Sequence, residues 1–135
     1  MQRFQIVNSV AGLDLGATNP KPTSVSGNQR EAAKALFQSN DKALNIGIWD
    51  CSPGRFTADR AESSETCYIL SGRVTLHDSD GRAQDLGAGD MMTLPKGWRG
   101  EWTIHEQTRK IYILHEDTDQ SPMIMPLAAR TDGSA

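Results

Sequence analysis

Apolar and polar residues alternate in short runs from Ile46 to His115, and turns rich in glycine and proline separate these runs. Alternation over four to eight residues is typical of strands with one buried face. The pattern predicts strands at 46–50, 55–62, 66–71, 73–78, 82–86, 91–94, 99–104 and 109–115. Many short strands at near-regular spacing indicate an all-β sandwich or barrel.

The segment 30–39 has two interpretations. Its alanine, leucine, lysine and glutamate residues favour a helix by propensity. However, Asn40 and Asp41 form a plausible turn into the alternating segment 42–49. We therefore favour a hairpin whose first arm lies near 33–39.

The chain divides into three predicted parts. Residues 1–43 form an N-terminal extension whose first 27 residues are broken by glycine and proline. We expect this extension to pack on the barrel or on a partner subunit. Residues 44–116 form the barrel. Residues 117–135 form a C-terminal tail that frays outside a small apolar cluster near Met123.

Composition excludes several classes of protein. The 135 residues carry a net charge of −3 and no basic stripe, which argues against nucleic acid as a partner. No apolar run approaches the roughly 20 residues that a membrane helix needs, or resembles a signal peptide. Two cysteines make no disulfide framework. We expect a soluble cytoplasmic domain that binds neither nucleic acid nor membrane.

Two segments anchored by glycine carry the strongest motif signal. In the first, Gly54 precedes Arg60-Ala-Glu62 by five residues, and Glu65 precedes Gly72 by six. The second reads G-D-M-M-T-L-P-K-G-W-R-G over residues 89–100. Both resemble the paired motifs of the cupin superfamily, in which histidines occupy the positions held here by Arg60, Glu62 and Gly100.

Sequence segments such as W-D-C-S-P-G and E-T-C-Y-I-L-S-G-R-V, within residues 44–114, resemble the single-domain cupin branch related to ureidoglycine aminohydrolase. The resemblance implies a jelly-roll β-barrel with an N-terminal hairpin extension, and it implies a homodimer. The aminohydrolase itself has two cupin domains and a metal held by histidines. Because this chain lacks those histidines, that activity does not carry over.

Strand alternation places Phe56, Ala58, Arg60 and Glu62 on one face, which the motifs assign to the barrel lumen. Glu65 would enter the same mouth from the next strand. We hypothesise that Arg60, flanked by Glu62 and Glu65, supplies the positive charge that a metal supplies in other cupins and binds a ligand carboxylate. The alternative is a salt bridge that only closes the barrel mouth.

The other candidates are less constrained. Gly100 would leave space in the pocket, which Trp102 could line or fill, and Trp98 would stand at the rim as a ligand contact. Trp102 also suits a core position. Cys67 continues the luminal face as a ligand-binding candidate, although a small buried residue is its simplest interpretation.

Lys110 is proposed with Glu65 as a catalytic pair, loosely matching a lysine in the aminohydrolase branch. Inside the lumen it would act as a base or pair with Glu65 or Glu106. Alternation does not decide its direction, and a surface position is the usual one for lysine.

No cofactor is expected, and manganese, zinc or iron is the lesser alternative, because His77, His105 and His115 all lie outside the motif positions. The sequence leaves three functions open. The chain binds a small polar metabolite and isomerises, cleaves or hydrolyses it. Alternatively, it is a metal-dependent aminohydrolase-like enzyme with unconventional ligands, or a non-catalytic sensor or dimerisation module.

Overall fold

The computed structural model describes residues 1–116, so the predicted tail lies outside the described residues. One short 3-10 helix and eight strands follow in the order η1 (Val10–Gly12), β1 (Asn19–Pro20), β2 (Arg30–Gln38), β3 (Leu44–Cys51), β4 (Gly54–Asp59), β5 (Ser64–Asp78), β6 (Ala83–Gly87), β7 (Met91–Leu94) and β8 (Arg99–His115). All strand pairs are antiparallel. The expected all-β jelly-roll class is confirmed. No described helix is long and apolar enough to cross a membrane.

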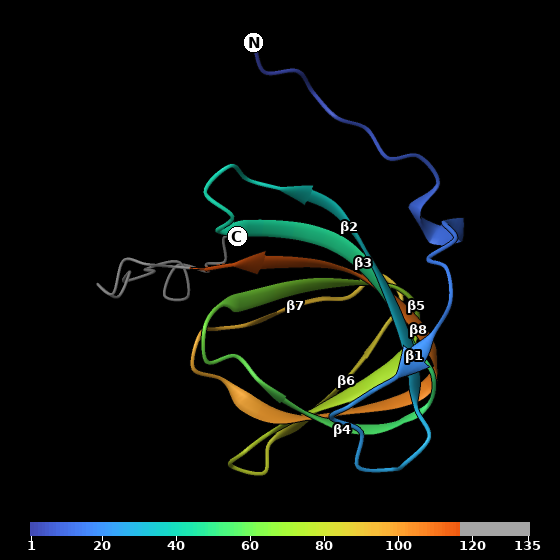
Figure 1. Cartoon of the computed structure of the whole chain (residues 1–135). Helices are drawn as coiled ribbons and strands as arrows, with labels where there is room; N and C mark the ends of the chain where they lie inside the picture. Colours follow the sequence, from blue (N-terminus) through green and yellow to red (C-terminus); the bar gives the residue numbers. More distant parts are fainter. Residues whose placement is uncertain (117–135) are drawn as a thin grey trace.

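Two long strands organise the barrel into two layers (Figure 1). The first layer holds β1, β2, β3, the second half of β8, the first half of β5, and β7. The second layer holds β4, the first half of β8, the second half of β5, and β6. The sequence predicted each long strand as two short ones. In the structure β5 and β8 bend from one layer into the other without a break.

The bend requires glycine at position 72. The register between β5 and β8 shifts between Ile69 and Val74, and Gly72 has φ +99°. A Cβ atom there would lie 2.6 Å from the Gln107 carbonyl oxygen and 2.6 Å from the Thr108 Cα. Only a residue without a side chain fits both the conformation and the space.

The hairpin prediction for 30–39 is confirmed, because β2 pairs with β3 along its length. The alanines of this segment serve a strand because tertiary pairing outweighs their helix propensity. The segment 19–25 then acts as a strap across one side of the barrel. Its Asn19 and Pro20 pair with β2, and Ser24 makes a bridge to Phe56 in β4. The strap therefore joins the edges of the two layers.

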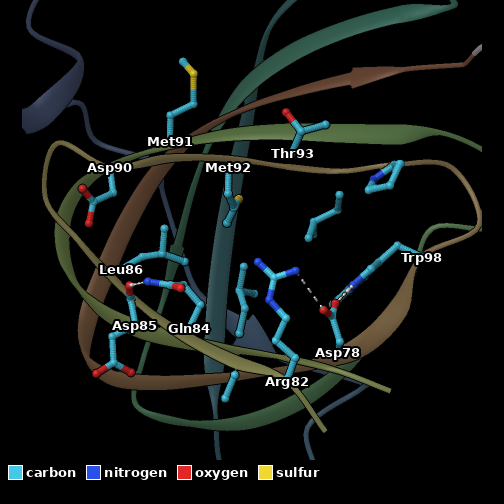
Figure 2. Close-up of a pocket in the computed structure, with 14 residues that line it drawn as sticks. Asp78, Arg82, Gln84, Asp85, Leu86, Asp90, Met91, Met92, Thr93 and Trp98 are labelled. Atoms are coloured by element: carbon cyan, nitrogen blue, oxygen red, sulfur yellow. Dashed lines mark hydrogen bonds and ion pairs between the residues drawn. The ribbon is translucent and has the colours of Figure 1, made fainter. Parts of the chain in front are cut away.

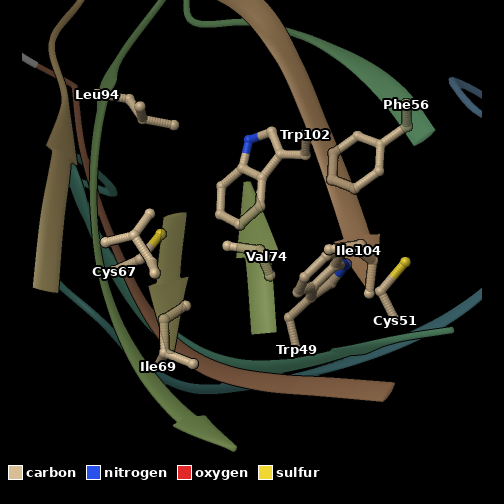
Figure 3. Packing of buried hydrophobic residues seen from close by; sticks show 10 residues of the cluster. Trp49, Cys51, Phe56, Cys67, Ile69, Val74, Leu94, Trp102 and Ile104 are labelled. Carbon is tan, nitrogen blue, oxygen red and sulfur yellow. The ribbon is translucent and has the colours of Figure 1, made fainter. Parts of the chain in front are cut away.

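A cluster of aromatic and aliphatic residues fills the space between the layers. Trp102 stacks on Phe56 with ring centroids 5.7 Å apart and meets Trp49 edge-on at 6.0 Å. Figure 3 shows these three rings together, with Cys67 and Ile69 at the opposite side of the cluster from Phe56. Such packing stabilises the barrel by burial and by ring contacts.

Replacing Gly72 with alanine should destabilise the barrel more than the same change at Gly81. Both glycines have positive φ, but a Cβ at Gly81 meets nothing within 4 Å. Conformation alone costs about 1–2 kcal/mol, and crowding at Gly72 adds about 1–3 kcal/mol. Urea denaturation of the two variants measures the difference, and equal losses of unfolding free energy would refute the crowding argument.

Candidate functional site

A cavity of about 410 Å³ opens inside the barrel beneath the strap. Its size falls within the range of small-molecule sites. Both layers and the strap contribute to its wall, which consists of Lys21, Thr23, Ala33, Trp49, Phe56, Thr57, Ala58, Asp59, Arg60, Glu65, Trp102, Lys110, Tyr112 and Leu114.

A buried ion pair lies in the wall of this cavity. Lys110 of β8 donates a hydrogen bond to Glu65 of β5, with 2.9 Å between Nζ and Oε2. The Lys110 ammonium also lies 4.3 Å from the ring centroid of Trp49 and 4.2 Å from that of Trp102. The lysine side chain is only 7 % exposed. The surface position that is usual for lysine is therefore wrong here, because a carboxylate and two aromatic faces stabilise the charge.

Both partners are charged at neutral pH. Burial alone would raise the pKa of Glu65, but the charge and hydrogen bond of Lys110, together with Arg60, lower it below its ordinary value. Burial likewise opposes the charge on Lys110, but Glu65 outweighs it and raises the pKa of Lys110. Lys110 is thus a fixed cation and a poor base.

Arg60 stands beside this pair with part of its hydrogen-bonding capacity unused. Its backbone N–H donates a hydrogen bond to the Trp98 carbonyl at 2.8 Å, and its carbonyl accepts one from the Gly97 N–H at 2.7 Å. The guanidinium lies 3.6 Å from the second oxygen of Glu65. Among the described residues its buried Nε finds no acceptor. A buried donor without a partner is costly, so the Arg60 guanidinium is not fully satisfied by the protein.

Glu62 does not reach the lumen. We expected it beside Arg60 on a strand extending to residue 62, but β4 ends at Asp59 and Glu62 is exposed. Alternation holds only within a strand, so it gives no direction for a residue beyond the strand end.

Gly100 does not leave open space. A Cβ at this position would collide with the Trp98 ring and the His77 carbonyl. Trp98 donates its Nε1–H to Asp78 at 2.6 Å. Instead of the luminal cavity, it lines a second cavity of about 680 Å³ between β6 and β7 (Figure 2). Trp102, in contrast, does line the luminal cavity.

Sequence reasoning missed Lys21 and Glu31. Lys21 comes from the strap and lies 2.9 Å from Glu31, with its ammonium 4.2 Å from the Phe56 ring centroid. Glu31 also accepts the indole hydrogen of Trp49 at 2.9 Å. An irregular leader has no periodicity from which the position of Lys21 could be predicted. Glu31 lies before the hairpin arm predicted near 33–39, so strand alternation was not applied to it, whereas β2 begins at Arg30.

The thiol groups of the two cysteines are not activated for chemistry. Cys51 and Cys67 are fully buried. Burial raises the pKa of Cys51 to about 11 and that of Cys67 to about 12. Neither thiol is ionised near neutral pH, so neither is activated as a nucleophile.

The cavity residues do not fit a divalent metal. No group of three or more His, Cys, Asp or Glu side chains among residues 1–116 is arranged to hold one. His77 and His105 instead meet Thr103 and Thr75, at 3.2 and 2.7 Å. Among the described residues Glu65 is the one deeply buried carboxylate, and it already faces two cations, which would repel a metal ion.

A family model described as the EutQ-like cupin domain matches residues 38–112. The chain belongs to this cupin family. Three solved structures are similar to it: the Clostridium difficile EutQ protein, an ethanolamine utilization protein Q from Salmonella typhimurium LT2, and a DUF861 protein of unknown function from Pseudomonas syringae pv. tomato str. DC3000.

Their sequence identities to the chain are 20 %, 18 % and 22 %, with TM-scores of 0.57, 0.60 and 0.67, in the same order. They cover 67 %, 73 % and 78 % of this chain and 71 %, 78 % and 46 % of their own lengths. Such identities show a shared fold and leave the activity open. No curated protein matches the chain.

Neutralising Glu65 should strongly destabilise this cupin. Glu65→Gln leaves the Lys110 ammonium buried without its counter-charge, which typically costs about 3–5 kcal/mol. Adding Lys110→Met to the same chain should restore most of that loss, because the deeply buried ammonium is then gone and the Arg60 guanidinium, which also loses Glu65, is 25 % exposed. Chemical denaturation of both variants measures this, and a single variant as stable as wild type would contradict the ion-pair geometry.

The same pair predicts a specific response to acid. The folded-state pKa of Glu65 is lowered, so its stabilisation is present above the unfolded pKa near 4.5 and is lost as pH falls through the folded value. The unfolding free energy of wild type should therefore drop more steeply below about pH 4.5 than that of Glu65→Gln/Lys110→Met. Identical acid profiles would contradict the direction of the shift.

Proposed function

We propose that this cupin binds a small metabolite carrying one carboxylate inside the barrel, without a histidine-held metal. The Arg60 guanidinium at the cavity wall, whose ion pair with Glu65 is a single contact of 3.6 Å, is the observation that carries the proposal. Lys21 has its counter-charge in Glu31, and Lys110 has a closer contact with Glu65 than Arg60 has. Arg60 is therefore the cation with charge left for a ligand.

The wall also limits the shape of the ligand. The ammonium groups of Lys21 and Lys110 lie over the rings of Phe56, Trp49 and Trp102, and Phe56 and Trp102 stack on each other. The ring faces are thus engaged by protein groups, which argues against a ligand held by aromatic stacking. A compact polar acid fits better, with its carboxylate against the planar fork of Arg60.

If the ligand is transformed, Glu65 and Lys110 are the groups for proton transfer in an isomerisation, lyase or hydrolysis step. Glu65 would accept a proton, and Lys110, as a fixed cation, would stabilise developing negative charge. The lowered pKa of Glu65 makes it a weak base. This weakness favours the second candidate function, a cytoplasmic sensor that binds the acid without turnover.

Carboxylate binding can be tested with metal-free protein by calorimetry and thermal shift. Lactate and pyruvate serve as monocarboxylates, lactamide as the neutral analogue and malate as a dicarboxylate. We expect the monocarboxylates to bind and raise Tm, and lactamide to bind far more weakly. Arg60→Gln should lower affinity about 10- to 100-fold, because a hydrogen bond to a charged group is worth about 1.5–3 kcal/mol.

Arg73→Gln is the matched control. Its side chain is 51 % exposed and pairs with Glu106, and neither residue lines the cavity, so removing its charge should leave affinity unchanged. Carboxylates that bind Arg60→Gln as tightly as wild type would overturn the proposed contact. Binding that requires added manganese, zinc or iron would overturn the metal-free site.

A further inference from the structure

The three tryptophans of the chain differ in how their indole N–H groups are satisfied. Trp49 donates its Nε1–H to Glu31 at 2.9 Å, and Trp98 donates its own to Asp78 at 2.6 Å. The Trp102 indole makes no hydrogen bond within the described part of the chain. Trp102 is nevertheless the most buried of the three, with 1 % of its surface exposed. A buried indole N–H usually has an acceptor, so this donor is available to a ligand.

The Trp102 nitrogen is open to the luminal cavity. Trp102 lines this cavity and does not line the one between β6 and β7. Among residues 1–116, the Arg60 Nε is the one enclosed side-chain atom without a hydrogen bond. The Trp102 nitrogen also has none, so it is not enclosed by the protein. Figure 3 shows this nitrogen on the edge of the ring that is turned away from Val74.

The ring of Trp102 is held by its neighbours, so the donor has a fixed direction. The ring stacks on Phe56 with centroids 5.7 Å apart and meets Trp49 edge-on at 6.0 Å. The Lys110 ammonium lies 4.2 Å from the ring centroid. These contacts engage the ring and leave its N–H free. A donor that is already in place loses little conformational entropy when a ligand binds, which favours affinity.

We infer that the Trp102 N–H binds an oxygen of the ligand, so that the luminal site selects oxo and hydroxy acids. The inference rests on the proposed function, in which Arg60 binds the ligand carboxylate. An indole N–H can only donate, and so can the ammonium of Lys110 and the guanidinium of Arg60. An accepting oxygen fits among these three donors.

The same donors select against amino acids. A ligand ammonium would meet two cations and an N–H group in this cavity. The carboxylate of Glu65 offers it no free partner, because both Arg60 and Lys110 already engage that side chain. An amino acid should therefore bind more weakly than the oxo or hydroxy acid of the same shape.

The two donors are close enough for one small ligand. Arg60 lies 3.6 Å from one oxygen of Glu65, and Lys110 lies 2.9 Å from the other. The Lys110 ammonium is in turn 4.2 Å from the Trp102 ring centroid. Because these contacts form an unbroken chain in the wall of a cavity of about 410 Å³, a short acid can reach the guanidinium and the indole N–H together. Its accepting oxygen then lies on the α-carbon or a few carbons further along.

Acids of matched shape test the inference with the full chain and without added metal. Pyruvate, lactate, alanine and 2-methylpropanoate differ only in one group on the α-carbon, which is a keto oxygen, a hydroxyl, an ammonium or a methyl group. Levulinate and 4-methylpentanoate repeat the comparison of oxygen with methyl at the γ-carbon. Calorimetry should show at least one oxygen-bearing acid binding about 3- to 10-fold more tightly than its methyl analogue. Alanine should bind more weakly than lactate.

Nuclear magnetic resonance of nitrogen-15-labelled protein observes the donor itself. The oxygen-bearing acid should shift the Trp102 indole proton downfield, whereas the Trp98 indole proton, which is held by Asp78, should not move. Trp102→Phe assigns the signal and should bind the oxygen-bearing acid and its methyl analogue alike. Tyr68→Phe, which removes an aromatic hydroxyl outside the cavity, is the control and should keep the preference. If Trp102→Phe does not fold by circular dichroism, the titration of wild type decides.

The failures of the two proposals are distinct. If no monocarboxylate binds, the proposed function and this inference both fall. If the methyl analogues bind as tightly as the oxygen-bearing acids, or alanine binds as tightly as lactate, only the inference is overturned. It is also overturned by an oxygen-bearing acid that binds without moving the Trp102 indole proton, or by a folded Trp102→Phe that keeps the preference.

Discussion

The ion pair between Lys110 and Glu65 determines what the interior of this barrel can do. Its two charges lie 2.9 Å apart in a wall of aromatic rings, where neither could be buried alone. Each partner keeps the other ionised, and Arg60 adds a second cation to Glu65. The proposed preference of the cavity for a small anion over a metal ion rests on this wall. Binding chemistry, charge state and acid stability therefore follow from one contact.

Much of the fold could be predicted because glycines in the sequence mark positions where the backbone turns or bends. Gly72 marks the point where β5 bends between layers, and the spacing of the two motifs identified the barrel. The continuity of β5 and β8 was missed, since a bend with a register shift has the same turn-like sequence as a break. The strand at 30–38 could be predicted only by weighing the turn at Asn40 against helix propensity.

The candidate site was predictable only where a residue lies inside a regular strand or at a motif position. Arg60 and Glu62 both lie beyond the end of β4. Backbone hydrogen bonds to Gly97 and Trp98 hold Arg60 beside Glu65 as expected, whereas Glu62 is exposed. Lys110 sits in a strand that is apolar on both faces, so alternation could not give its direction. Lys21 belongs to a strap whose path depends on tertiary contacts with β2 and β4. Such contacts leave no local pattern in a sequence.

Membership of the EutQ-like cupin family fixes the architecture. The central claim is that fixed side-chain charge serves where other cupins carry an ion. Nitrogen-15 NMR of the Lys110 Nζ across pH tests it most directly. The account predicts a charged ammonium at pH 7 that persists beyond the ordinary lysine pKa of about 10.5 and is absent in Lys110→Met. A neutral amine at pH 7 would contradict it.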